Sequence, residues 1–134
     1  MFRISLTSAL LTAVLPFSAH AASAPVNLTC MQQAVSARDT AVLSAFSTYT
    51  QTVMTSFQQR LVGLQSAWAI QDEGNRQNTI KTTWVTYKDS LKTAQTVLKD
   101  KRKDAWKVFR DARKSCNGSS NSDTGGGESV DSKL

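Results

Sequence analysis

Apolar residues recur at steps of three, four and seven along the first half of the chain, the spacing of one face of an α-helix. Thr29 precedes this stripe and Gln32 follows three residues later, an arrangement typical of a capping box at a helix N-terminus. The pattern therefore predicts a first long helix that opens at Thr29. Its apolar residues are Val35, Val42, Phe46, Tyr49, Val53, Phe57, Leu61, Leu64 and Trp68.

The pattern breaks over residues 71–76, where a turn is expected. Gly74 and Asn75 are the residues there best able to adopt the left-handed conformation that ends a helix. A second apolar stripe at helical spacing follows at once and predicts a second long helix. Its members are Tyr87, Leu91, Ala94, Leu98, Ala105, Phe109, Ala112 and Cys116.

Two helices of about 40 residues, each near 60 Å long at about 1.5 Å per residue, must fold back antiparallel across a short turn to bury their stripes. Cys30 and Cys116 each lie 43 positions from residue 73, the centre of the turn. The predicted fold is therefore all-α, a long antiparallel helical hairpin over residues 29–116 closed by one disulfide. Gly63 leaves open an alternative, a three-helix bundle in which the first helix breaks near that glycine.

Cys30 and Cys116 are the chain's two cysteines and bracket the whole predicted helical region. A redox-active pair is usually close in sequence, as in Cys-x-x-Cys, and a metal site needs further ligands. In an oxidising compartment, an isolated pair of this kind indicates a structural disulfide.

The N-terminal segment has the composition of an export signal. Arg3 precedes an apolar run from Ile4 to Phe17, and Ala19-His20-Ala21 forms a small-residue cleavage site. Residues 1–21 are therefore predicted to be a signal peptide and residues 22–28 a short linker. The mature protein is expected to be secreted, in the periplasm or on the exterior of the cell envelope.

The C-terminal segment, residues 117–134, is rich in glycine and serine and carries several acidic residues. It offers almost no apolar surface to bury, and such composition predicts a disordered tail.

No set of residues suggests catalysis. His20 is the chain's one histidine and would leave with the signal peptide, while the acidic residues are scattered singly among lysines. A thin hairpin also has no interior volume for a substrate cleft. We expect a protein that is not an enzyme, with no catalytic residues, metal, cofactor or small-molecule substrate.

Basic residues of the second predicted helix fall within about a third of its circumference, opposite the buried stripe. Trp84 and Trp106 flank this basic stripe. Such a surface can hold an anionic partner such as an envelope polymer, lipid headgroups or nucleic acid; the alternative is a solvated face that only confers solubility. The candidate contact residues are Lys81, Lys88, Lys92, Lys99, Lys103, Lys107, Arg110 and Lys114.

Two helices leave apolar residues on their flanks partly open, among them Leu43, Met54, Val97 and Val108. Burial of these flanks between two copies would form a four-helix bundle. We therefore expect self-association into a homodimer.

Four segments resemble a group of short secreted helical proteins encoded by candidate-phyla-radiation bacteria: Cys30–Asp39, Ala67-Trp68, Thr83–Tyr87 and Ala105–Cys116. The likeness includes the terminal cysteine pair and the repeated Trp-x-x-aromatic form. It implies export, a bacterial source and a cysteine pair at the ends of the domain. The group has no assigned activity.

Together these features predict a secreted, non-catalytic helical interaction protein that contacts an anionic partner through its basic face. The alternative is a periplasmic chaperone-like or structural spacer protein, because some periplasmic chaperones are also basic helical hairpins. The Leu-Thr-x-x-Gln motif of one such group fits here once, at Leu28–Gln32, and is not repeated.

Overall fold

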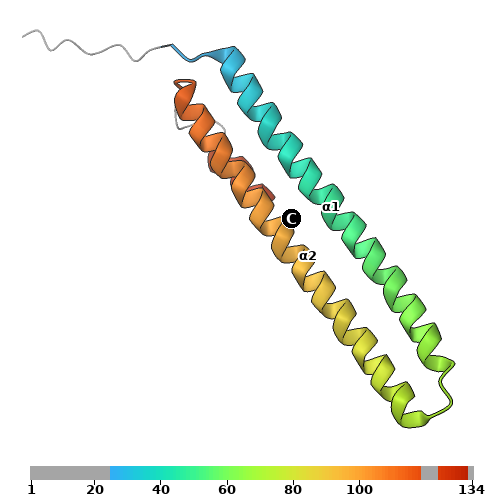
Figure 1. Ribbon diagram of the computed structural model, residues 1–134. Coiled ribbons are helices and arrows are strands. Elements are labelled where there is room, and N and C mark those ends of the chain that lie inside the picture. Colours follow the sequence, from blue (N-terminus) through green and yellow to red (C-terminus); the bar gives the residue numbers. More distant parts are fainter. Residues whose placement is uncertain (1–24, 119–123, 133–134) are drawn as a thin grey trace, which may run out of the picture.

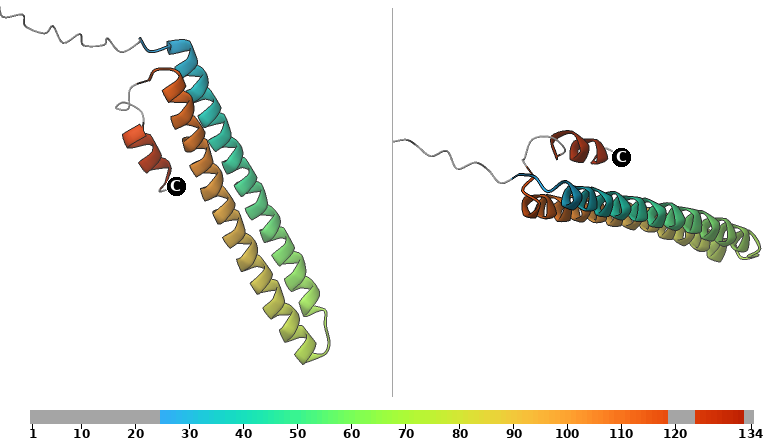
Figure 2. Two further views of the ribbon diagram at one scale, coloured as in Figure 1. Left: turned by 60° about the vertical axis from the view of Figure 1, so that its left-hand side comes forward. Right: turned by 90° about the horizontal axis from the view of Figure 1, so that it is seen from above.

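The computed structural model describes residues 25–118 and 124–132 of the 134-residue chain. Helices α1 (Leu28–Trp68) and α2 (Glu73–Ser115) lie side by side and antiparallel, and the short helix α3 (Thr124–Asp131) lies outside the pair against α2 (Figures 1 and 2). The predicted all-α hairpin is confirmed. α1 runs unbroken through Gly63, so the three-helix alternative is not formed.

The open end of the hairpin is closed by the predicted disulfide. Cys30 and Cys116 are bonded across 86 residues of sequence, with their Cα atoms 5.5 Å apart. Beside this bond, the backbone N–H of Asn27 donates to the carbonyl oxygen of Cys116 at 3.0 Å. The register derived by reflection about residue 73 is therefore the register of the folded chain.

The N-terminus of α1 differs from the prediction by its cap. α1 begins at Leu28, and the side chain of Asn27 accepts the backbone N–H of Cys30 at 3.0 Å. Asparagine is at least as good an N-cap as threonine, and Asn27 has the extended backbone conformation that a cap requires. Thr29 therefore lies inside the helix, and the linker ends at Asn27. The predicted signal peptide, residues 1–21, lies outside the described residues.

The turn between the long helices is built differently from the sequence prediction. Asp72 caps α2 by accepting the backbone N–H of Asn75 at 2.8 Å, so Gly74 and Asn75 belong to the first turn of α2. Neither has a positive φ, and the predicted left-handed stop is wrong. A carboxylate is favoured at a helix N-terminus by the helix dipole, which makes Asp72 the stronger signal. Arg76 ties the turn by donating to the carbonyl oxygens of Ile70 at 3.0 Å and Gln71 at 3.2 Å.

At the other end of α2 the chain leaves the helix through a left-handed residue, Asn117, at φ 57°. The N–H of Gly118 donates to the carbonyl of Arg113, and that of Asn117 to the carbonyl of Lys114. These two bonds form a Schellman motif, which satisfies helix carbonyls that otherwise lack partners.

The seam between α1 and α2 repeats every 11 residues. The buried residues of α1 are Ala34, Ala45, Ser56 and Ala67, and an 11-residue period corresponds to about 3.67 residues per turn, close to that of a straight helix. Mirrored about residue 73, small residues face one another at the same period. The facing pairs are Cys30 and Cys116, Ala41 and Ala105, Thr52 and Ala94, and Gly63 and Thr83.

Gly63 shows how closely the helices approach. A Cβ atom added to Gly63 would lie 2.8 Å from Cγ2 and 2.9 Å from Oγ1 of Thr83. Glycine therefore stays inside a helix here, although it costs about 1 kcal/mol relative to alanine, because the seam leaves no room for a methyl group.

We predict that Gly63→Ala destabilises the native protein but stabilises a Thr83→Ala variant by up to about 1 kcal/mol, because alanine at 83 lacks both crowding atoms. The four proteins form a double-mutant cycle that can be measured by urea unfolding. Gly74→Ala is the control, since a Cβ there meets only Asp72 Oδ1 at 3.6 Å. Equal effects of Gly63→Ala in both backgrounds would show that the helices are not in this contact.

Candidate functional site

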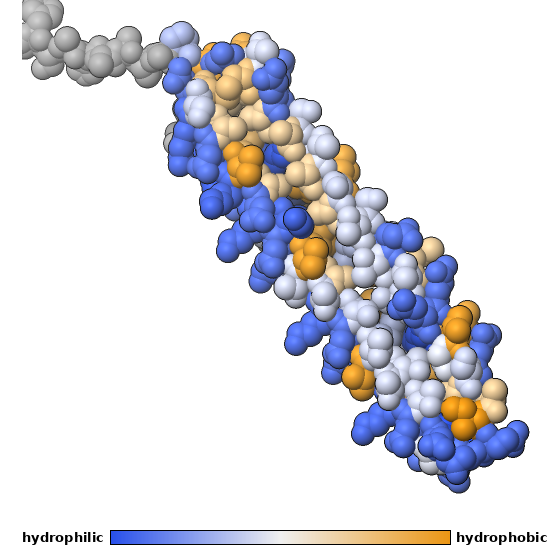
Figure 3. Space-filling view, viewed as in Figure 1, coloured by the Kyte–Doolittle hydropathy of each residue, from blue (hydrophilic) through white to orange (hydrophobic). Residues whose placement is uncertain are grey.

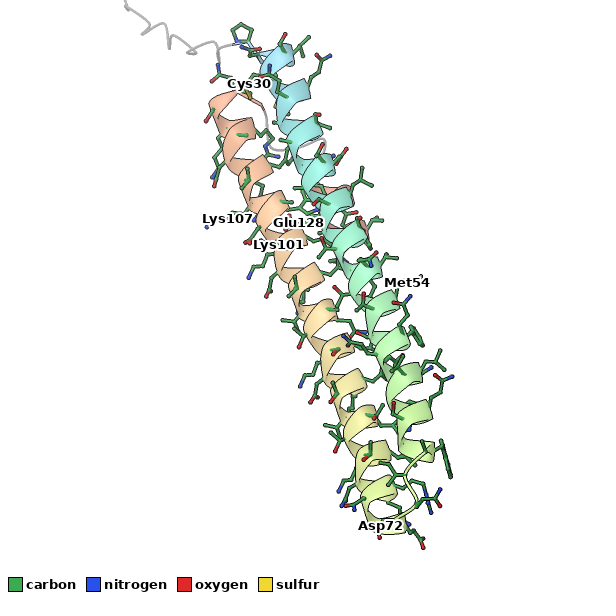
Figure 4. All side chains as sticks on the ribbon, turned by 45° about the vertical axis from the view of Figure 1, so that its right-hand side comes forward. Cys30, Met54, Asp72, Lys101, Lys107 and Glu128 are labelled. Atoms are coloured by element: carbon green, nitrogen blue, oxygen red, sulfur yellow. A yellow bond between two sulfur atoms is a disulfide. The ribbon has the colours of Figure 1, made fainter. Side chains whose placement is uncertain are left out.

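The basic stripe lies along the exposed side of α2. Its seven lysines are exposed and Arg110 is half-buried. The stripe follows the 11-residue period of the seam: Lys81, Lys92, Lys103 and Lys114 form one line, and Lys88, Lys99 and Arg110 form a second beside it. Lys107 lies on the outer side of α2, and Met54 lies on the outer side of α1, across the hairpin (Figure 4).

Most of the stripe has no acidic partner within the described part of the chain. Arg110 pairs with Glu128 at 2.6 Å, and Lys114 approaches Asp111 at 3.4 Å. The remaining six lysines form no ion pair with a described residue. Their ammonium groups are therefore available to an external anion, except where α3 covers part of the stripe.

The two tryptophans that were predicted to flank the stripe, Trp84 and Trp106, have different surroundings. Trp84 is 47% exposed and contacts Tyr87 edge-on at 6.0 Å between ring centroids. Trp106 is 3% exposed and belongs to the core cluster with Ala34 and Phe109. The ring of Trp84 is therefore accessible to a partner, whereas that of Trp106 is not, because it packs in the seam and is covered by α3.

Each tryptophan segment of α2 is crossed by one arginine of α1. Arg38 lies over Trp106 and Phe109, at 4.5 and 4.6 Å from the ring centroids. Arg60 lies over Trp84 and Tyr87, at 5.0 and 4.6 Å. These cation–π contacts form two equivalent layers. The sequence held a signal for them, since Arg38 and Arg60 are separated by the same 22 residues as the two tryptophans.

α3 docks its acidic residues on the stripe. Arg110 Nη1 donates to both carboxylate oxygens of Glu128, at 2.6 and 2.7 Å, and Trp106 Nε1 donates to Asp131 at 2.8 Å. Gly127 packs so closely on the Trp106 ring that an added Cβ would lie 2.8 Å from Cη2.

The prediction of a disordered tail over residues 117–134 is therefore corrected for residues 124–132. Composition indicated disorder because the segment has little apolar surface. Its order comes instead from charge-assisted hydrogen bonds and from a glycine that fits against an aromatic ring. Residues 119–123, 133 and 134 lie outside the described part.

The opposite side of the hairpin is lined by hydroxyl groups. Two adjoining hollows of about 340 and 590 Å³ lie between the helices there, sharing Ser56, Gln59 and Thr86. Hydroxyls in and near this region donate to backbone carbonyls of their own helix four residues earlier, as Ser56 does to Thr52 and Thr83 to Thr79, both at 2.8 Å. These side chains are satisfied locally and let the helices approach.

Within residues 25–118 and 124–132 there is no group of three or more metal-ligating side chains, and no helix there is long and apolar enough to cross a membrane. In comparisons with known proteins, the chain matches no family model, no curated protein and no solved structure.

We predict that the pair of changes Glu128→Gln and Asp131→Asn loosens α3 and exposes Trp106, because it weakens the hydrogen bonds that hold α3 to α2. Acrylamide quenching should increase in a background where Trp68 and Trp84 are replaced by Phe. Glu73→Gln with Asp89→Asn makes the same charge change away from α3 and should leave quenching unaltered. Equal quenching in the two double variants would contradict the docking of α3.

Proposed function

We propose that this protein is a non-catalytic, exported interaction protein whose α2 stripe binds an anionic polymer or surface. The observation that carries the proposal is the docking of α3. The stripe already binds one carboxylate of its own chain, Glu128, through Arg110, and the neighbouring Trp106 holds a second carboxylate, Asp131, through its indole N–H. A surface that holds anions within the chain is suited to hold them in a partner.

The charge distribution supports the same proposal. Six exposed lysines without a described acidic partner repeat along about 40 Å of helix between Lys81 and Lys107, at about 1.5 Å per residue. A repeating row of cations matches a partner with repeating anionic groups, such as an envelope polymer, the headgroups of a lipid surface or a nucleic acid. Binding would release counterions and weaken steeply with salt.

Replacing Lys81, Lys88 and Lys92 by glutamine should weaken binding and lower its salt dependence, because each lost phosphate contact reduces the slope of log affinity against log salt by about 0.9. These three lysines lie away from α3. The measurement is a titration of duplex DNA, of anionic vesicles and of an acidic cell-wall polymer between low and moderate salt.

The matched control replaces Gln33, Gln51 and Gln58 by glutamate, which changes the net charge equally at exposed positions of α1. It should bind more strongly than the lysine variant to every ligand that the native protein binds. If the two variants lose affinity alike, net charge alone acts and the stripe is only a solubilising face.

The second candidate is a chaperone-like or spacer role through apolar surface, which would also support a homodimer. Leu43, Met54 and Val108 are 69%, 56% and 63% exposed. On the visible face, apolar side chains gather in separate patches along the hairpin, with polar residues between them (Figure 3). Separate patches suit a second copy with the same 11-residue spacing better than an unfolded client.

Sedimentation of the oxidised protein should therefore reveal a dimer that dissociates when Leu43 and Met54 are both replaced by glutamine. The salt concentration should change this equilibrium little, because apolar burial holds the copies together. Exposed Gln58→Ala is the control. A monomer at high protein concentration would contradict the predicted dimer and would leave the apolar interface without support.

A further inference from the structure

Arg102 of α2 lies outside the exposed stripe and is buried. Arg102 is only 7% exposed, and its guanidinium lies 5.7 Å from the centroid of the Phe46 ring. Its Nε–H is buried and has no hydrogen-bond acceptor among the described residues. A buried charged donor without an acceptor is costly, so such a group indicates an acceptor that binds from outside the chain.

Arg102 lines two adjoining hollows, one between α2 and α3 and the other between α1, α2 and Ser132. One, of about 290 Å³, is also lined by Lys103, Trp106 and the α3 residues Glu128 and Asp131. The other, of about 220 Å³, is also lined by Tyr49, Gln95 and Leu98. Lys99 and Ser132 line both hollows.

The charges around these hollows leave an excess of two positive charges. Three cations line them, Lys99, Arg102 and Lys103, together with two carboxylates. Arg110 neutralises Glu128, whereas Asp131 accepts only the neutral N–H of Trp106, so the three cations face one uncompensated carboxylate. The remaining excess matches a dianion, and the side-on fork of Nε and a terminal nitrogen of arginine fits two oxygens of a tetrahedral oxyanion.

We propose that the hollows around Arg102 form a discrete binding site for one phosphate group, held by Arg102 and flanked by Lys99 and Lys103. The site goes beyond the stripe, because it recognises one compact group by a buried guanidinium rather than a repeating polymer by exposed lysines. Tyr49, Gln95 and Ser132 supply neutral hydrogen-bonding groups at its edge.

The direct test is the NMR signal of the Arg102 Nε–H in the ¹⁵N-labelled, oxidised protein, assigned by its loss in Arg102→Lys. Titration with inorganic phosphate at constant ionic strength should move this signal and the Trp106 indole signal along a saturable curve. Sodium chloride in place of phosphate should not. A linear drift that is the same with both salts would overturn the proposal.

Variants distinguish binding at the Arg102 site from a general effect of the positive charge of α2. Arg102→Gln should weaken phosphate binding about tenfold or more, because a charge-assisted hydrogen bond is lost. In case Arg102→Gln impairs folding, Lys103→Gln is exposed and should weaken binding about threefold. Lys101→Gln is the matched control: it removes the same charge from α2 next to Arg102, at an exposed lysine that lines neither hollow. An equal loss in the Lys101 and Lys103 variants would overturn the site.

Two further experiments identify the source of the phosphate and distinguish the Arg102 site from the stripe. Vesicles containing phosphatidic acid, compared with phosphatidylcholine alone, should compete with free phosphate if a lipid headgroup enters the hollows, and should not if the ligand is a free phosphate. The variant lacking Lys81, Lys88 and Lys92 should keep its affinity for inorganic phosphate. If this variant lost its affinity for inorganic phosphate, the whole basic face, and not Arg102, would bind the anion.

Discussion

Closure of the open end by the Cys30–Cys116 disulfide is the constraint on which the hairpin depends. Two helices in contact bury only one stripe each, and the core cluster of buried residues consists of Ala34, Trp106 and Phe109. Closing a loop of 86 residues contributes about 4.6 kcal/mol in the chain-entropy treatment, whose physical origin is disputed. That is comparable to the whole stability of a small domain, about 5–15 kcal/mol. The bond is also consistent with an oxidising extracellular or periplasmic compartment.

The fold was predictable because a long helix has few alternatives when proline is absent and apolar residues keep one period. The two cysteines then fixed the register. Details that depend on competition between neighbouring residues were not predictable in this way. Asn27 replaced Thr29 as the cap and Asp72 replaced a glycine stop, since both candidates in each place were chemically suitable and only the backbone geometry decides between them.

The candidate site was only partly visible in the sequence. Periodicity located the exposed lysines, because position on a helix follows from numbering alone. It could not show that α3 docks on Arg110, since that contact depends on a tail with little apolar surface. Nor could it separate Trp106 from Trp84 or show that Arg102 is buried. Those differences depend on the packing of α1 and α3 against α2, which covers Trp106 and leaves Trp84 half-exposed. The 11-residue period was present in the sequence and is clearest once the buried residues are known.

Two arginines of the seam, Arg38 and Arg60, fix the position of α2 relative to α1. A seam of leucines would tolerate shifts of one helix along the other, because apolar contacts are not directional. Here Arg38 and Arg60 each lie over two aromatic rings of α2, and a shift would separate these cations from those rings. The seam therefore holds α2 in one position relative to α1. The lysine spacing is set by the helical geometry of α2 itself, and the fixed seam adds a constant orientation of that row relative to α1.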